Sequence, residues 1–205
     1  MQLQNPLGVV APTLEAPVLA VLARAEQSFT GRQVHRLAGR GTEQGVRNAL
    51  ERLVERGVVH RSTVGASYAY RLNRGHLAAP HLIGLATLRD ELFTRWRSRI
   101  AAWPITPRLV TLFGSAARND MRPDSDIDLL VVTDDDAEAL ADAITSLQVE
   151  TTVWTGNDTR VLHIDAHDVS ADEPVLVTAA DEGVTIVGDP LWLRRALTKG
   201  ADGGP

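Results

Sequence analysis

Two apolar runs separated by a polar turn constrain the fold of this chain more than any other feature. The run Leu109–Phe113 is rich in β-branched and aromatic residues and stops at a Gly-Ser pair, as a buried strand does before a sharp turn. The run Leu129–Val132 predicts a second strand, which the chain enters through Asp126 and Asp128. Because these aspartates are two residues apart, they project from the same face of that strand. The pattern predicts an α/β fold whose sheet presents two carboxylates on one side.

The polar residues of this turn predict a site for a metal ion and a phosphate. Gly114 permits a close approach, and the hydroxyl of Ser115 with the backbone N–H groups after it can hold an anionic phosphate. Neighbouring carboxylates are costly unless a cation lies between them, and an all-oxygen site suits Mg²⁺ or Mn²⁺. The stretch therefore indicates metal-assisted phosphoryl chemistry on a nucleoside triphosphate. The alternative, a solvated acidic loop, is disfavoured by the apolar run that follows the acids.

The segment carries Gly114-Ser115-x-Ala117-Arg118 and then Asp126-x-Asp128, with ten residues between the serine and the first aspartate. This joint pattern resembles the signature of nucleotidyltransferases of the DNA polymerase β superfamily, and most of all the small bacterial members, including minimal nucleotidyltransferase antitoxins and aminoglycoside nucleotidyltransferases. The resemblance implies that Gly114, Ser115 and Arg118 bind the nucleotide. It also implies that Asp126 and Asp128 hold Mg²⁺ or Mn²⁺ while AMP from ATP, or another nucleotide, passes to a hydroxyl and pyrophosphate is released.

A third carboxylate is usual in this family, on the strand beside the Asp-x-Asp strand. The segment Arg160–Asp165 predicts such a strand, and Asp165 is the candidate third metal ligand or base. His163, nearer the centre of the strand, is an alternative that replaces the acid or accompanies it. If neither residue fills the role, we expect a weak or inactive enzyme; the alternative for Asp165 is that it caps the following turn.

The N-terminal part of the chain has a different organisation. Helices are predicted over residues 13–26, 30–37 and 42–56, with capping signals at Ser28, Thr30 and Thr42. Two alternating segments joined around Gly65 predict a hairpin over residues 58–72. Three short helices followed by a hairpin resemble a winged helix-turn-helix domain.

Charge also distinguishes the two parts. Residues 1–104 contain 14 Lys and Arg against 7 Asp and Glu, whereas residues 105–205 contain 7 against 19. DNA contacts are predicted for side chains on the second helix, the third helix and the hairpin: Arg32, Arg36, Gln44, Arg47, Asn48 and Arg61. The alternative is a protein–protein module whose arginines are only solvated, and no dimerisation helix is obvious.

The remaining pattern completes the division into domains. Residues 81–103 predict one long amphipathic helix beneath the C-terminal sheet, and Thr133–Asp136 predict an acidic cap for the next helix. A helix over residues 173–181, a strand over 183–188, a closing helix over 191–199 and a frayed glycine-rich tail follow. We therefore expect a winged helix-turn-helix domain over residues 1–76, a connecting helix over 77–104 and a nucleotidyltransferase domain with a small mixed sheet over 105–205.

Composition limits the kinds of metal site and the cellular compartment that we expect for this protein. The absence of cysteine excludes disulfides and thiolate metal sites, and the chain has neither a long apolar run nor the N-terminal features of a signal peptide. We therefore expect a cytoplasmic protein without a membrane partner. The acceptor hydroxyl belongs to a partner protein, an RNA or a small molecule. A second hypothesis is a DNA-binding regulator in which the nucleotidyltransferase fold is an inactive nucleotide sensor.

Overall fold

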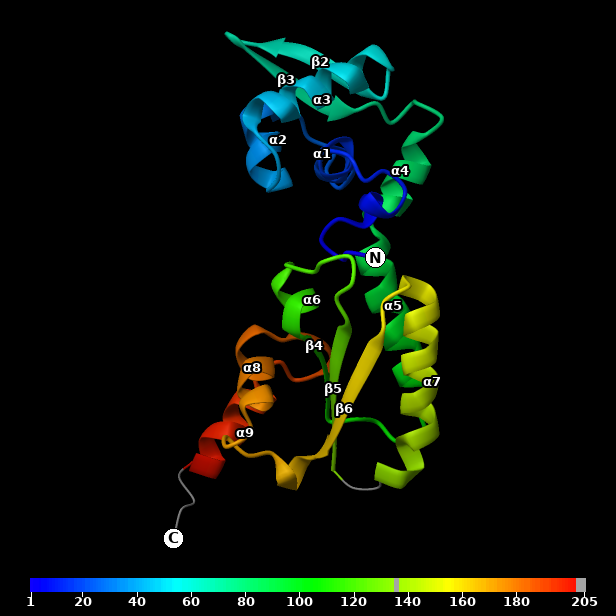
Figure 1. The fold of residues 1–205 in the computed structure, drawn as a ribbon, viewed down its shortest axis with the longest axis vertical. Helices are drawn as coiled ribbons and strands as arrows, with labels where there is room; N and C mark the ends of the chain where they lie inside the picture. The colour runs from blue at the N-terminus through cyan, green and yellow to red at the C-terminus, as the bar shows by residue number, and fades with distance from the viewer. Residues whose placement is uncertain (135–136, 202–205) are drawn as a thin grey trace. The chain divides into compact units, whose positions relative to one another are not determined.

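The computed structural model describes residues 1–134 and 137–201, and the chain divides into two compact units, Met1–Asp90 and Glu91–Pro205 (Figure 1). Asp135 and Asp136 of the predicted acidic cap lie outside the described residues, as does the predicted frayed tail. The division falls within a helix, whereas the predicted boundaries followed residues 76 and 104.

The first unit combines helices with a three-stranded antiparallel sheet. Its helices are η1 (Pro6–Val9), α1 (Glu15–Ala23), α2 (Gly31–Ala38), α3 (Glu43–Glu55) and α4 (Ala79–Ala86). Its strands are β1 (Phe29–Thr30), β2 (Val59–Val64) and β3 (Ser67–Leu72), in the order β1-β3-β2. The three predicted helices and the hairpin are confirmed, while β1 was not predicted. The assignment of this unit as a winged helix-turn-helix stays a prediction.

Side-chain caps fix where α2 and α3 begin. The Thr30 hydroxyl accepts the backbone N–H of Gln33 at 3.3 Å, and the Gln33 side chain accepts the backbone N–H of Thr30 at 2.8 Å. The Thr42 hydroxyl likewise accepts the N–H of Gly45 at 3.1 Å. Each cap satisfies backbone donors that the first turn of a helix leaves unpaired. The two threonines that predicted the helix starts therefore form the caps in the structure.

The single helix predicted over residues 81–103 is wrong, because two helices occupy this segment. They are α4 and α5 (Leu88–Ala101), separated at Thr87, whose hydroxyl donates to the Ile83 carbonyl at 3.0 Å. The buried Ala86 of α4 belongs to the core of the first unit, whereas Trp96 and Ile100 are buried in the second. One apolar periodicity therefore serves two separate cores.

The second unit is a mixed sheet between two helical layers. Its strands are β4 (Leu109–Phe113), β5 (Ile127–Thr133), β6 (Thr159–Asp165) and β7 (Val184–Gly188), in the order β6-β5-β4-β7. Its further elements are α6 (Gly114–Arg118), α7 (Ala137–Thr155), η2 (Ala166–Asp168), α8 (Pro174–Glu182) and α9 (Trp192–Ala201). Only β5 and β6 are parallel, since β4 runs antiparallel to both β5 and β7. The predicted small mixed sheet is confirmed.

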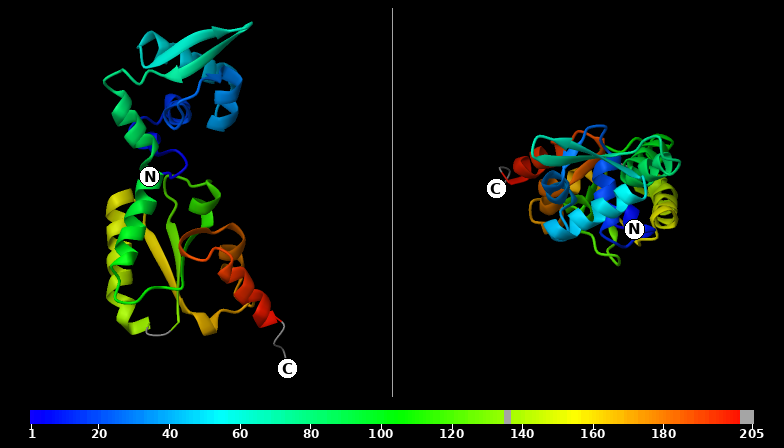
Figure 2. Two further views of the ribbon diagram at one scale, coloured as in Figure 1. Left: turned by 180° about the vertical axis from the view of Figure 1, so that it is seen from behind. Right: turned by 90° about the horizontal axis from the view of Figure 1, so that it is seen from above.

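Helices cover both faces of this sheet (Figures 1 and 2). One layer consists of α5 and α7, and the other of α6, α8 and α9. In the first layer the indole N–H of Trp96 donates to the Thr151 hydroxyl at 2.8 Å in a fully buried contact. In the second, Leu176 and Leu193 pack against Leu130 of the sheet. None of the helices in the described part of the chain is long and apolar enough to cross a membrane.

Candidate functional site

The Gly-Ser turn, Gly114 and Ser115, lies directly beside the first residues of β5. Phe113, the last residue of β4, pairs with Asp128, so the chain turns at Gly114 next to that carboxylate. Gly114 has a φ of 69°, in the left-handed region that favours glycine. A Cβ placed on it would lie 2.8 Å from Asp128 Oδ2. The structure therefore brings the turn and this carboxylate together, with room between them only for a glycine.

Replacing Gly114 by alanine tests this contact. We expect Gly114→Ala and the control Gly156→Ala each to lower the free energy of unfolding by about 1–2 kcal/mol, because both glycines have positive φ. Only at Gly114 does the new methyl group meet Asp128, since nothing lies within 4 Å of a Cβ at Gly156. Gly114→Ala alone should therefore weaken Mn²⁺ binding in calorimetry, by about tenfold. Equal Mn²⁺ affinities of the two variants would contradict the importance of the contact.

Asp126 and Asp128, the carboxylate pair, share one face at the start of β5. Ile127 between them is fully buried, and the Asp126 side chain is 29% exposed. Burial raises the pKa of Asp128, the charge of Asp126 raises it further, and Arg160 opposes both effects. A divalent cation would relieve this repulsion, and carboxylate oxygens beside a tight turn fit Mg²⁺ or Mn²⁺.

The raised pKa of Asp128 makes a prediction for stability. The folded protein holds this proton more tightly than the unfolded chain does, so the stabilising contribution is present at acidic pH and is lost as the pH rises through the folded pKa. In metal-free buffer we expect Asp128→Asn to be more stable than the wild type at pH 7, by up to about 1 kcal/mol. The difference should disappear toward pH 3 in urea denaturation. A variant of the exposed Asp142 in α7 is the control, and an advantage of Asp128→Asn that grows on acidification would contradict the assignment.

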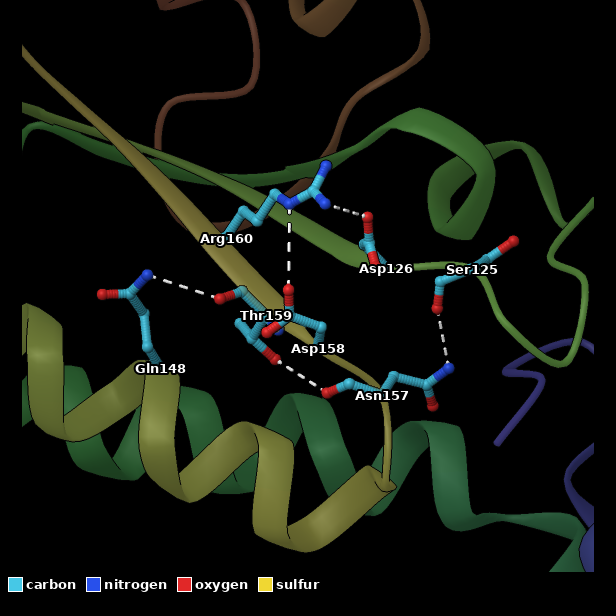
Figure 3. A network of polar contacts seen from close by, with 7 residues as sticks. All are labelled: Ser125, Asp126, Gln148, Asn157, Asp158, Thr159 and Arg160. Atoms are coloured by element: carbon cyan, nitrogen blue, oxygen red, sulfur yellow. Dashed lines mark hydrogen bonds and ion pairs between the residues drawn. The ribbon is translucent and has the colours of Figure 1, made fainter.

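Arg160 and Asp158 lie near Asp126, the first residue of the carboxylate pair (Figure 3). Arg160 is the β6 partner of Asp128 in the parallel register. Its Nη2 lies 2.8 Å from Asp126 Oδ2, and its Nε lies 3.9 Å from Asp158 Oδ2. Neither residue belongs to the sequence motif that predicts the site. A parallel pairing of β6 with β5 would have identified them, because it places the first residues of one strand beside the first residues of the other.

The loop before β6 holds the start of β5 in place. Asn157 is 3% exposed, and its side-chain amide donates to the Ser125 carbonyl at 2.8 Å. The backbone N–H of Ile127 donates to the Asp158 carbonyl at 2.8 Å. A buried amide that makes its hydrogen bonds rigidifies the segment it joins. These contacts therefore position Asp126 and Asp128 from the neighbouring strand.

The structure does not bring Asp165 or His163 to the carboxylate pair, which corrects the expected third ligand. Asp165 pairs with Thr133, five residues beyond Asp128 and roughly 16 Å along the strand. Asp165 and His163 also project from the face of the sheet opposite to Asp128. There the Thr133 hydroxyl donates to Asp165 Oδ1 at 3.2 Å and lies 2.9 Å from His163 Nε2. The reason is that parallel strands run in the same direction, so the end of β6 lies beside the end of β5. Asp165 occupies the N-cap of η2 without a side-chain cap bond.

Arg118, the predicted nucleotide ligand at the end of α6, is held by two acids. Its Nη1 lies 2.6 Å from Glu182 Oε1, and its Nε lies 3.2 Å from Asp120 Oδ2. The side chain is 45% exposed. A phosphate oxygen can therefore reach this guanidinium only in exchange for, or in addition to, a carboxylate.

The predicted DNA contacts all lie on the surface of the first unit. All six of these predicted contacts are exposed, namely Arg32, Arg36, Gln44, Arg47, Asn48 and Arg61. Gln44 donates to Asn48 at 2.8 Å, and the Arg61 guanidinium lies 4.6 Å from the centre of the Tyr68 ring. Arg32, Arg47 and Tyr68 are among the residues that line a hollow of about 530 Å³. The structure therefore groups Arg32 of α2, Arg47 of α3 and Arg61 of β2 near Tyr68 of β3.

Comparisons with known proteins find one family that part of the second unit resembles. Residues 91–179 match the family described as "Nucleotidyltransferase domain". None of the curated proteins compared matches the chain. Three solved structures are similar to this chain. One is a toxin–antitoxin with AMP-PNP, at 17% sequence identity and a TM-score of 0.42, and another is a mutant MntA–HpeT toxin–antitoxin, at 15% identity and a TM-score of 0.42. The third is a tri-AMPylated Shewanella oneidensis HEPN toxin in complex with an MNT antitoxin, at 16% identity and a TM-score of 0.40. The matches cover 54%, 54% and 55% of this chain and 84%, 84% and 83% of theirs.

Proposed function

Since residues 91–179 match the nucleotidyltransferase domain family, we propose that the second unit transfers a nucleoside monophosphate, AMP from ATP, to a hydroxyl group and releases pyrophosphate. The observation that carries the proposal is the Gly-Ser turn beside the carboxylate pair, where Gly114 allows the Asp128 carboxylate to lie against the turn. A tight turn that a ligand can approach, next to two carboxylates, combines the elements that bind a triphosphate and its divalent cation.

In the proposed mechanism, Asp126 and Asp128 would hold Mg²⁺ or Mn²⁺ through their carboxylates. When bound, the ion neutralises charge on the phosphates and lowers the pKa of the acceptor hydroxyl. Ser115 donates its hydroxyl and backbone hydrogens to the terminal phosphates, and Arg118 adds a donor when it exchanges an acid for a phosphate oxygen. The acceptor oxygen forms a bond to the α-phosphorus, the bond from this phosphorus to pyrophosphate breaks, and the hydroxyl proton leaves to solvent.

The acceptor is proposed to be a hydroxyl of a partner protein, an RNA or a small molecule. The test incubates the full chain with Mg²⁺, cell lysate and ATP labelled at the α-phosphate, in parallel with ATP labelled at the γ-phosphate. Nucleotidyl transfer predicts an acceptor labelled from the α-phosphate alone, together with pyrophosphate release and loss of both signals in EDTA. Label from the γ-phosphate would indicate a kinase instead, and no label with no pyrophosphate would contradict the proposed activity.

A second candidate function, DNA binding, is favoured by the exposed polar residues of the first unit. Arg32 and Arg47 line one hollow with Tyr68, and Arg61 lies against the same tyrosine. Cationic side chains of this kind bind phosphates, and each contact increases the salt dependence of the affinity. In this case the chain regulates transcription, with the nucleotidyltransferase domain as an enzyme or as an inactive nucleotide sensor.

The test of this second function is a mobility-shift titration on the protein's own promoter. DNA binding predicts a complex whose affinity falls steeply between 50 and 200 mM salt. A shift without nucleotide turnover would favour the sensor, whereas no shift at low salt would favour a protein–protein role for the first unit.

A further inference from the structure

A single arginine links the carboxylate pair to a third acid. Arg160 lies on β6 in register with Asp128, and its guanidinium donates across the strands to Asp126 at 2.8 Å. A guanidinium is always charged, so it supplies positive charge where two neighbouring carboxylates repel each other. Arg160 therefore neutralises part of the negative charge that a metal ion would otherwise neutralise.

The same arginine has a second carboxylate within reach. Its Nε lies 3.9 Å from Asp158 Oδ2, while the neighbouring Nη2 contacts Asp126 (Figure 3). The Arg160 side chain is 67% exposed, and that of Asp158 is 68% exposed. Exposed ion pairs of this kind are weak, so exchanging one carboxylate for the other requires little free energy. Arg160 can thus release Asp126 and remain paired.

We propose that Arg160 is a positioning residue that neutralises Asp126 in the metal-free protein and moves to Asp158 when a divalent cation binds the carboxylate pair. The proposal rests on the proposed function, because it assumes that Asp126 and Asp128 hold the metal. Since Arg160 and the cation compete for the Asp126 carboxylate, the arginine weakens metal binding. It also keeps the charge near Asp126 balanced before and after the ion arrives.

Calorimetric titration of the full chain with Mn²⁺, without nucleotide, tests the competition. We expect Arg160→Gln to bind Mn²⁺ about three- to tenfold more tightly than the wild type, because it removes the competing charge. Arg160→Lys retains the charge and should stay close to the wild type. The control Arg95→Gln removes an arginine from a comparable exposed pair, 2.9 Å from Glu91, and should not change the affinity.

The outcomes separate this inference from the metal site itself. Tighter binding by Arg160→Gln alone supports the competition. Unchanged binding by Arg160→Gln, with binding lost in Asp128→Asn, overturns the inference and leaves the proposed metal site in place. Equal tightening by Arg160→Lys or by Arg95→Gln also overturns it, because charge at this position is then not the cause. No Mn²⁺ binding by the wild type or by Arg160→Gln overturns both proposals.

Discussion

Replacing either Asp126 or Asp128 by asparagine should reduce nucleotidyl transfer by about 10³-fold or more while the domain stays folded. Asparagine retains the size of the side chain and removes the charge that the proposed cation requires. A factor of 10³ corresponds to about 4 kcal/mol of lost transition-state stabilisation, which is within the range for a metal that binds phosphoryl oxygens. The measurement is α-phosphate labelling of the lysate acceptor with Mg²⁺, alongside thermal unfolding of each variant.

Asp124 provides the matched control for these substitutions. It is an exposed aspartate two residues before Asp126, in the same loop. We expect Asp124→Asn to retain transfer within about twofold, as substitutions away from a site usually do. Transfer that survives both Asp126→Asn and Asp128→Asn would rule out the proposed metal site. Loss of folding in these variants is not expected, because Asp128→Asn removes a repulsive charge.

Replacing Trp96 by alanine should lower the free energy of unfolding by about 3–5 kcal/mol, enough to unfold a large fraction of a marginally stable domain. Trp96 is fully buried, and it packs edge-on against Phe93 with ring centres 5.2 Å apart. Its indole N–H also donates to Thr151 of α7 at 2.8 Å. Alanine leaves a large cavity between α5 and α7 and removes the donor. The measurement is urea denaturation followed by circular dichroism.

Two further variants separate packing from hydrogen bonding at Trp96. Thr151→Val preserves the shape of the threonine and removes the acceptor, so it should destabilise by about 1–3 kcal/mol. Trp154→Ala removes a half-buried tryptophan near Arg95 in the same unit, and it should have a smaller effect than Trp96→Ala. Equal effects of the two tryptophan substitutions would contradict the importance of burial at Trp96.

Local features of the fold were predictable because they depend on neighbouring residues. Thr30 and Thr42 marked helix starts through side-chain caps that the structure contains. The spacing of Asp126 and Asp128 predicted a shared face, which strand geometry imposes whatever the partner strands are. The Gly-Ser turn indicated a close approach, and the structure places Asp128 there.

Features that depend on distant pairing were not predictable in the same way. The alternation within Arg160–Asp165 predicted a strand, but it carries no information on which residue lies beside Asp128. The parallel register gives that place to Arg160 and carries Asp165 to the far end of β5. Similarly, the apolar periodicity continues through Thr87, where the chain changes from one core to another.

The position of β6 at the margin of the sheet makes the charge of the site easy to alter. Among the described strands, β6 has a neighbour on one side only, so residues 158 and 160 can change without repacking a central element. A single substitution there could convert a cation-repelling environment into a cation-attracting one, while the turn and the paired aspartates stay as they are. Substitutions on β6 could therefore change which ions this domain prefers, in evolution or by engineering.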